Sequence, residues 1–75
     1  MQKYLDINKN SGVTAYELGK DFIRVEFNDK TTYLYTEEST GKEAIKQMKN
    51  LAQRGYGLAT YINQHVRSQF AKKEQ

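Results

Sequence analysis

The spacing of the apolar residues changes once along this chain, close to residue 40, and that change limits the folds it can form. Ile23, Val25 and Phe27 occupy every second position of one segment, as in a strand with one buried face. After residue 40 the apolar residues instead recur every three or four positions, as on one side of a helix. Strands that precede helices in this way are typical of an α+β domain.

The first half of the chain predicts a three-stranded antiparallel sheet over residues 13–18, 22–27 and 31–36. Gly19-Lys20-Asp21 and Asn28-Asp29-Lys30 supply the turns between these strands, and loops this short require antiparallel pairing. Residues 4–7 are a candidate for a fourth, N-terminal edge strand, and residues 8–12 read as a loop.

The second half predicts two amphipathic helices that pack together on one face of the sheet. The first is expected to start at a capping box formed by Thr40 and Glu43 and to end at Gly55. Its apolar stripe consists of Ala44, Ile45, Met48, Leu51 and Ala52. The second is expected to start near Gly57 and to bury a ladder of Leu58, Ile62, Val66 and Phe70. We therefore expect an N-terminal segment (1–10), one domain (11–71) and a frayed tail (72–75).

Composition narrows the function classes. The 75 residues include no cysteine and one histidine, which excludes disulfides and thiolate chemistry and argues against a metal site or any cofactor. No apolar stretch has the length of a signal peptide or a membrane span, so we expect the cytoplasm and no membrane partner. Residues 42–75 carry seven Lys or Arg against two Glu, whereas residues 1–41 carry five against seven Asp or Glu. The helical half is therefore the side that an RNA or another polyanion would approach.

Two tyrosines on the third strand are the most informative side chains. Tyr33 and Tyr35 share one face, about 6.6 Å apart along the strand at typical rise. A two-residue hairpin loop places them on the outer face of the sheet beside Arg24. A three-residue loop, residues 28–30, places them in the core under the helices. Since Lys30 offers no glycine for the tight two-residue turn, we favour the three-residue loop.

Catalytic signatures are nearly absent, and we predict that the chain is not an enzyme. His65 is the only general base near neutral pH, and no nucleophile motif or phosphate-binding loop accompanies it. On its helix, His65 is expected to pack rather than to react. Glu37 and Glu38 are expected to be surface charges and not an acid–base pair.

From residue 11 to about residue 70 the chain resembles the KTSC domain, a short module named from the C-terminus of some lysyl-tRNA synthetases and also found alone in bacteria and phages. The resemblance rests on Ser11-Gly12-Val13, on Tyr33-Leu34-Tyr35 as the central YxY, on Leu51-Ala52-Gln53-Arg54-Gly55, and on a closing helix with Tyr61-Ile62 and Val66-Arg67. It implies the strand-then-helix order above and, through the synthetases, an association with RNA.

Two functions stay open at this point. The first is RNA binding, in which sheet tyrosines stack on unpaired bases and basic side chains contact phosphates. The candidate contact residues are Tyr33, Tyr35, Arg24, Lys42, Lys46, Lys49, Arg54 and Arg67. The alternative is a protein-interaction or self-associating (homodimeric) module, since so short a chain has no other means of stabilisation and leaves one face of its sheet uncovered.

Overall fold

The structure is a computed structural model that describes residues 1–5 and 12–74. Its elements follow in the order β1 (Gln2–Lys3), β2 (Val13–Leu18), β3 (Phe22–Phe27), β4 (Thr32–Thr36), α1 (Glu37–Thr40), α2 (Lys42–Arg54), α3 (Leu58–Tyr61), the π-helical segment η1 (Ile62–Val66) and β5 (Lys72–Glu74). The five strands pair in sequence order and all pairs are antiparallel. The α+β class is thus confirmed, with more strands than the three or four expected.

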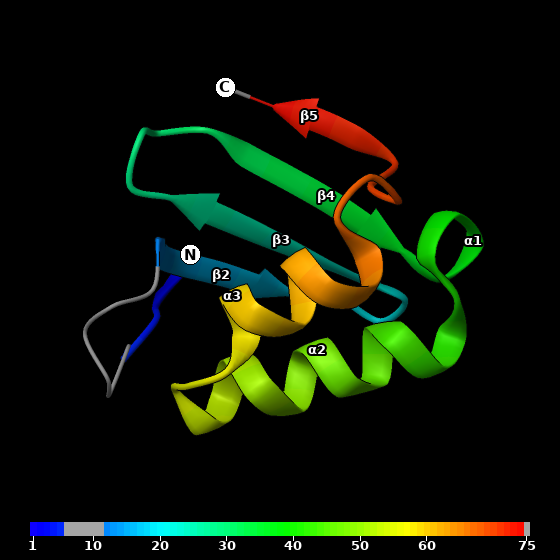
Figure 1. Cartoon of the computed structure of the whole chain (residues 1–75), viewed down its shortest axis with the longest axis horizontal. Coiled ribbons are helices and arrows are strands. Elements are labelled where there is room, and N and C mark those ends of the chain that lie inside the picture. Colours follow the sequence, from blue (N-terminus) through cyan, green and yellow to red (C-terminus); the bar gives the residue numbers. More distant parts are fainter. Residues whose placement is uncertain (6–11, 75) are drawn as a thin grey trace.

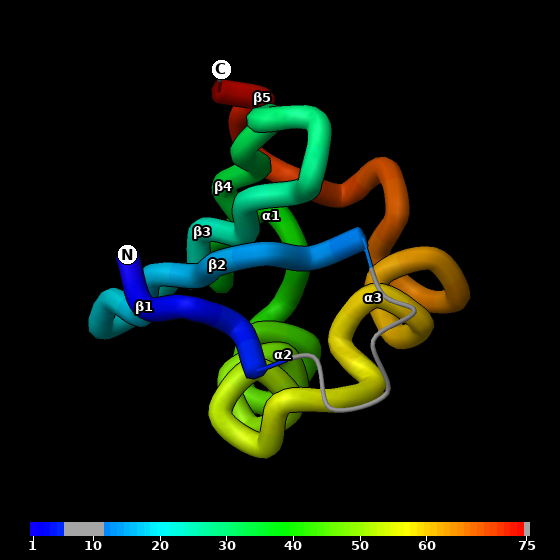
Figure 2. Tube along the Cα trace, turned by 90° about the vertical axis from the view of Figure 1, so that its left-hand side faces the viewer, coloured from blue at the N-terminus to red at the C-terminus, as the bar shows by residue number. Residues whose placement is uncertain are grey.

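The helices cover one face of the sheet. In Figure 1, α3 and the turn that follows it lie in front of the strands and α2 lies below them, and the N- and C-terminal ends of the chain lie toward opposite edges of the sheet. In Figure 2 the same helices lie below and to the right of the strands, and the left-hand side of the sheet carries no helix. Among the described residues, no helix combines the length and the apolar character that crossing a membrane requires.

The β3–β4 hairpin has the three-residue loop that the sequence favours. Val25 pairs with Tyr33 and Ile23 with Tyr35, so both tyrosines point to the helical side of the sheet. The Phe27 amide donates to the Thr31 carbonyl at 2.8 Å, which closes the loop. This loop needs positive φ at one position only, and Lys30 takes it at 72°.

The start of the first long helix differs from the prediction. A short helix, α1, precedes α2, and it is Thr36 whose hydroxyl accepts the Ser39 amide and forms the capping box. Thr40 instead donates its hydroxyl to the Gln69 carbonyl at 2.7 Å. Gly41 separates the two helices at a φ of 106°, which a residue with a side chain rarely adopts. The predicted capping box of Thr40 and Glu43 is therefore wrong.

The apolar stripe of α2 packs on the sheet as predicted. Ile45, Met48 and Ala52 are buried, and burial of an Ile or Met side chain contributes about 1.5–3 kcal/mol. The helix ends at Gly55, which has left-handed geometry and a φ of 85°. Leu58, Ile62 and Val66 of the second ladder are also buried.

The C-terminal part departs most from expectation. The second helix becomes π-helical at Ile62 and ends before Phe70, and the tail expected to fray forms β5 on the edge of β4. The Ala71 amide donates to the Leu34 carbonyl at 2.7 Å, so β5 satisfies backbone groups that β4 would otherwise expose. Because β5 consists of three charged residues, the sequence shows no alternation of apolar and polar residues that would predict this strand.

The N-terminal edge strand is present but shifted. It covers Gln2–Lys3, whereas Tyr4 and Leu5 of the predicted range 4–7 are not in a strand and residues 6–7 lie outside the described residues. Tyr4 is buried, with its hydroxyl accepting the Leu58 amide at 3.3 Å. The predicted loop at 8–12 lies largely outside the described residues.

The positive φ of Lys30 leads to a stability prediction. A non-glycine residue in left-handed geometry is strained by about 1 kcal/mol, so we expect Lys30→Gly to raise the free energy of unfolding by about 0.5–1 kcal/mol. Lys20→Gly, a matched change at a position without positive φ, should lower it. Urea denaturation of both variants measures the difference, and destabilisation by Lys30→Gly would show that the hairpin has another turn.

Candidate functional site

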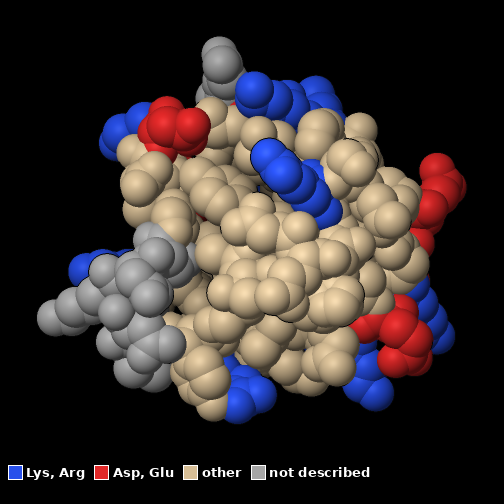
Figure 3. All heavy atoms as spheres, viewed as in Figure 1, with Lys and Arg blue, Asp and Glu red and all other residues tan. Residues whose placement is uncertain are grey.

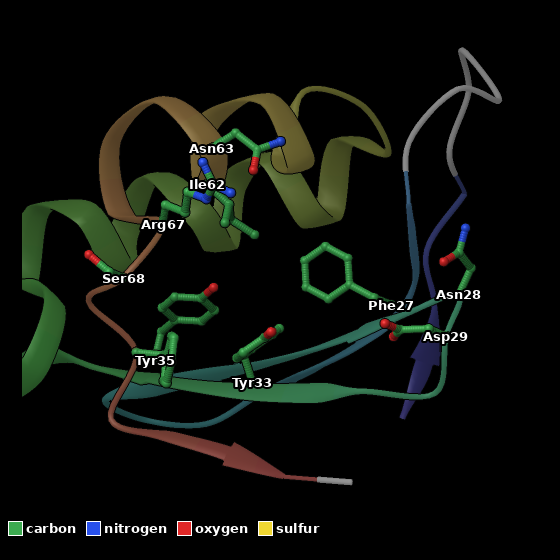
Figure 4. A pocket seen from close by; sticks show the side chains of 10 residues that line it. Phe27, Asn28, Asp29, Tyr33, Tyr35, Ile62, Asn63, Arg67 and Ser68 are labelled. Carbon is green, nitrogen blue, oxygen red and sulfur yellow. The ribbon is translucent and has the colours of Figure 1, made fainter.

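A cavity of about 450 Å³ lies between the β3–β4 hairpin and η1. Its lining residues are Phe27, Asn28, Asp29, Tyr33, Tyr35, Ile62, Asn63, Arg67, Ser68 and Phe70. Figure 4 shows the rings of Phe27, Tyr33 and Tyr35 rising from the sheet toward the helical side. A volume of this size is within the range of small-molecule sites, about 300–1,000 Å³.

The floor of the cavity is aromatic. Tyr35 is 1% exposed and Tyr33 is half-buried, so the sheet offers no open stacking platform. The Tyr33 ring lies 4.8 Å from the Phe70 ring and 5.6 Å from the Phe27 ring, centroid to centroid. Phe70 also meets the edge of Tyr35, with centroids 6.4 Å apart. The two tyrosines therefore line the cavity and do not lie on an open surface of the sheet.

Backbone irregularities lie on two sides of this cavity. The π-helical segment η1 supplies Ile62 and Asn63, and it leads directly into Arg67 at the mouth. On the other side, the hairpin loop with the strained Lys30 supplies Asn28 and Asp29. Single π-helical turns and strained turns are enriched at functional sites. The hairpin loop was predicted from its turn residues, but no pattern in the sequence predicts the π-helical segment or the cavity between the two, so Asn28, Asn63 and Ser68 were not chosen as site residues.

Asp29 is the one carboxylate among the cavity-lining residues. Its Oδ1 accepts the Thr31 amide at 3.0 Å, and this hydrogen bond lowers the Asp29 pKa below its ordinary value. The carboxylate therefore stays ionised and helps to hold the loop, while its exposed position leaves it available at the rim.

Arg24 lies on the opposite face of the sheet from the tyrosines. Its guanidinium contacts the Glu17 carboxylate at 2.8 Å and the Glu74 carboxylate at 3.1 Å, and it lies 5.0 Å above the Phe22 ring. Hydrogen bonds to Glu17 and then Glu74 raise the Arg24 pKa. Since two carboxylates already neutralise it, Arg24 joins strands β2, β3 and β5 and is not placed to contact a ligand beside Tyr33.

The predicted lysines of α2 lie away from the cavity. Lys49 donates to the carbonyls of Gly19 and Lys20 at 2.6 and 3.0 Å, so it ties α2 to the β2–β3 turn. Lys42 and Lys46 are exposed. They line a second hollow of about 460 Å³ together with Glu37, Lys49, Ile45 and Glu43. Its mixed charges do not single out an anion.

The two arginines of the helical half have different environments. Arg54 stacks on Tyr56, 4.6 Å from the ring centre, and donates to the Tyr56 hydroxyl. Arg67 is exposed at the cavity mouth and has no ion pair among the described residues. Figure 3 shows the charged side chains mostly around the rim of the helical face, with one basic side chain near its middle. Of the eight predicted contact residues, Tyr33, Tyr35 and Arg67 line the aromatic cavity, whereas Lys42, Lys46 and Lys49 line the second hollow.

His65 is exposed and its ring lies against Tyr61, with centroids 4.7 Å apart. Within residues 1–5 and 12–74, no three His, Cys, Asp or Glu side chains come together in a way that would hold a metal ion.

Burial of Tyr35 leads to a pH prediction. Burial raises the pKa of Tyr35 to about 12 from 10.0, so its contribution to stability is complete below pH 10 and is lost as the pH rises from 10 to about 12. We expect the free energy of unfolding to fall by about 1–2 kcal/mol. This is less than the free energy that a shift of two pKa units corresponds to, because the ring borders an open cavity. Urea denaturation of wild type and Tyr35→Phe at pH 9 and 11.5 tests this, and parallel pH dependences would contradict it.

Comparison with protein-family models, curated proteins and solved structures finds no match to this chain. The resemblance to the KTSC domain, which rests on short motifs such as Tyr33-Leu34-Tyr35, therefore stays a prediction.

Proposed function

We propose that this chain is a non-enzymatic module that binds single-stranded RNA across the mouth of the aromatic cavity. One observation carries the proposal: Tyr33, Tyr35 and Arg67, from distant parts of the sequence, line the same cavity. Unpaired RNA offers flat bases to aromatic side chains and phosphates to cations, and proteins that bind single strands combine these two kinds of contact. We also propose membership of the KTSC family, whose link to tRNA synthetases favours RNA over DNA.

The charges around the cavity favour an anionic partner. Arg67 stands at the mouth, Lys30 follows the rim residue Asp29 in the hairpin loop, and the Lys73 ammonium lies 6.0 Å from the centre of the Tyr33 ring. Among the lining residues, one cation (Arg67) faces one carboxylate (Asp29), and Lys73 beside Tyr33 and Lys30 next to Asp29 in the chain add positive charge to this part of the protein. Lys42 and Lys46 lie on another part of the surface and are not needed in this proposal.

RNA binding through about three phosphate contacts predicts a moderate salt dependence. The logarithm of the association constant should fall with a slope of about −2 against the logarithm of salt, or roughly fifteenfold between about 50 and 200 mM. Fluorescence anisotropy with a labelled single-stranded RNA measures this slope. Arg67→Gln should weaken binding and reduce the slope, whereas Arg54→Gln should do neither. No binding at tens of micromolar protein, or an association constant that does not change with salt concentration, would contradict the proposal.

Self-association is the second candidate, and one observation favours it. Phe22 and Leu34 are half-buried on the outer face of the sheet, which no described helix covers (Figure 2). An isologous dimer through this face would bury both side chains further.

The dimer is tested by light scattering coupled to size exclusion at rising protein concentration. We expect a mass that approaches twice 8.7 kDa for wild type and the monomer mass for Leu34→Lys. A wild-type protein that stays monomeric at high concentration would contradict this second candidate.

A further inference from the structure

The Tyr35 hydroxyl is a polar group whose environment points to a ligand. Its residue is 1% exposed, yet the hydroxyl makes none of the hydrogen bonds found among the described residues. No described polar side-chain atom is both fully enclosed and without a partner, so this oxygen borders the cavity that its ring lines. Figure 4 shows the hydroxyl directed into that space. A buried phenol of this kind gains a hydrogen bond when a ligand brings a polar atom to it.

The walls around this hydroxyl suit a flat ligand. Tyr33 and Phe27 meet at an interplanar angle of 82°, and Tyr35 and Phe70 at 89°, so the rings form a cornered surface without a continuous stack. Ile62 of η1 closes the opposite side. A planar ring can lie between these apolar side chains while its polar edge reaches the Tyr35 hydroxyl.

The mouth of the cavity suits an anionic group on the same ligand. Arg67 has no ion pair among the described residues, and a guanidinium binds phosphate oxygens in a forked arrangement. Asn63 and Ser68 beside it are exposed, neutral hydrogen-bonding side chains. A flat base, a polar edge and a phosphate at the mouth together describe a nucleotide.

We propose that the aromatic cavity is a binding site for one nucleotide unit, with the base against Tyr33 and Ile62, its polar edge on the Tyr35 hydroxyl and its phosphate on Arg67. The inference deepens the proposed RNA binding and rests on it for one of two sources of the ligand. The unit comes either from an unpaired position in an RNA strand or from a free nucleoside monophosphate.

The test compares ligands that carry the base, the phosphate, or both. Calorimetry or NMR titration is performed with AMP, with adenosine and with ribose 5-phosphate on the full chain. We expect saturable binding of AMP, weaker binding of adenosine and at least about tenfold weaker binding of ribose 5-phosphate. Ribose 5-phosphate binding as tightly as AMP would overturn the base site.

Matched variants locate the binding. Tyr35→Phe should weaken AMP binding about fivefold to tenfold, and Arg67→Gln by a similar factor, because each removes one hydrogen-bonding or ionic contact. Tyr16→Phe and Arg54→Gln, which make the same chemical changes away from the cavity, should stay within about twofold of wild type. Equal affinities of Tyr35→Phe and Tyr16→Phe would overturn the proposal.

A second pair of variants keeps the test valid if Tyr35→Phe alters folding. Asn63 lines the cavity and Gln64 beside it does not, although both are exposed. Asn63→Trp should block AMP, and Gln64→Trp should not. AMP binding unchanged by Asn63→Trp would contradict a ligand in this cavity.

The same experiment separates this inference from the proposed function. A labelled oligoadenylate that binds wild type and Tyr35→Phe equally, with the expected salt slope, would overturn the nucleotide site and leave RNA binding standing. AMP binding without oligoadenylate binding would support the site with a free nucleotide as its ligand and overturn the proposed function. Absence of both would overturn both.

Discussion

The turn between β3 and β4 is the constraint on which the rest of this structure depends. Because the loop has three residues, Val25 pairs with Tyr33 and Ile23 with Tyr35. A loop one residue shorter would move every side chain of β4 to the other face. The helices would then cover Thr32 and Leu34, and the tyrosines would lie in solvent beside Arg24. The three-residue loop that strains Lys30 is thus the loop that places the tyrosine rings beneath the helices.

The C-terminal segment covers the tyrosines that the turn places on the helical side of the sheet. Phe70 packs on both tyrosines, and the hydrogen bonds of Gln69 to Thr40 and of Ala71 to Leu34 hold the chain on either side of it. On the outer face, Arg24 connects Glu17 of β2 with Glu74 of β5. A domain this small has little core, so contacts that join its last residues to the middle of the sheet matter more than in a larger protein.

Much of the fold could be predicted from local pattern. Alternation identified β3, helical spacing identified the buried stripe of α2, and the lack of a glycine at Lys30 pointed to the longer turn. Residues 72–74 were expected to fray because the last residues of a domain are poorly ordered unless they are tied down, and they are ordered here because they pair with β4. Thr40 was mistaken for the cap of α2, but it is the last residue of α1, which Thr36 caps, and α2 starts after Gly41 without a side-chain cap.

The residues of the candidate site could likewise be predicted only in part. Tyr33, Tyr35 and Arg67 could be chosen by residue type, but residue type also selected Arg24, Lys49 and Arg54, which make contacts within the protein. The partners of Arg24 and Lys49 include residues distant in sequence (Glu74, and Gly19 with Lys20), whereas Arg54 contacts Tyr56, two residues away. The cavity itself lies where a π-helical turn faces the hairpin loop, and although the loop could be predicted from its turn residues, the π-helical turn could not be predicted from apolar spacing.

The central claim is that Tyr33 and Tyr35 lie on the helical side of the sheet and line a cavity closed by the C-terminal segment. Nuclear Overhauser effects from the tyrosine ring protons test it directly in solution. The account predicts contacts from the Tyr33 ring to the Phe70 ring, whose centroids lie 4.8 Å apart. Contacts from the tyrosine rings to the Arg24 side chain, with none to Phe70, would contradict it.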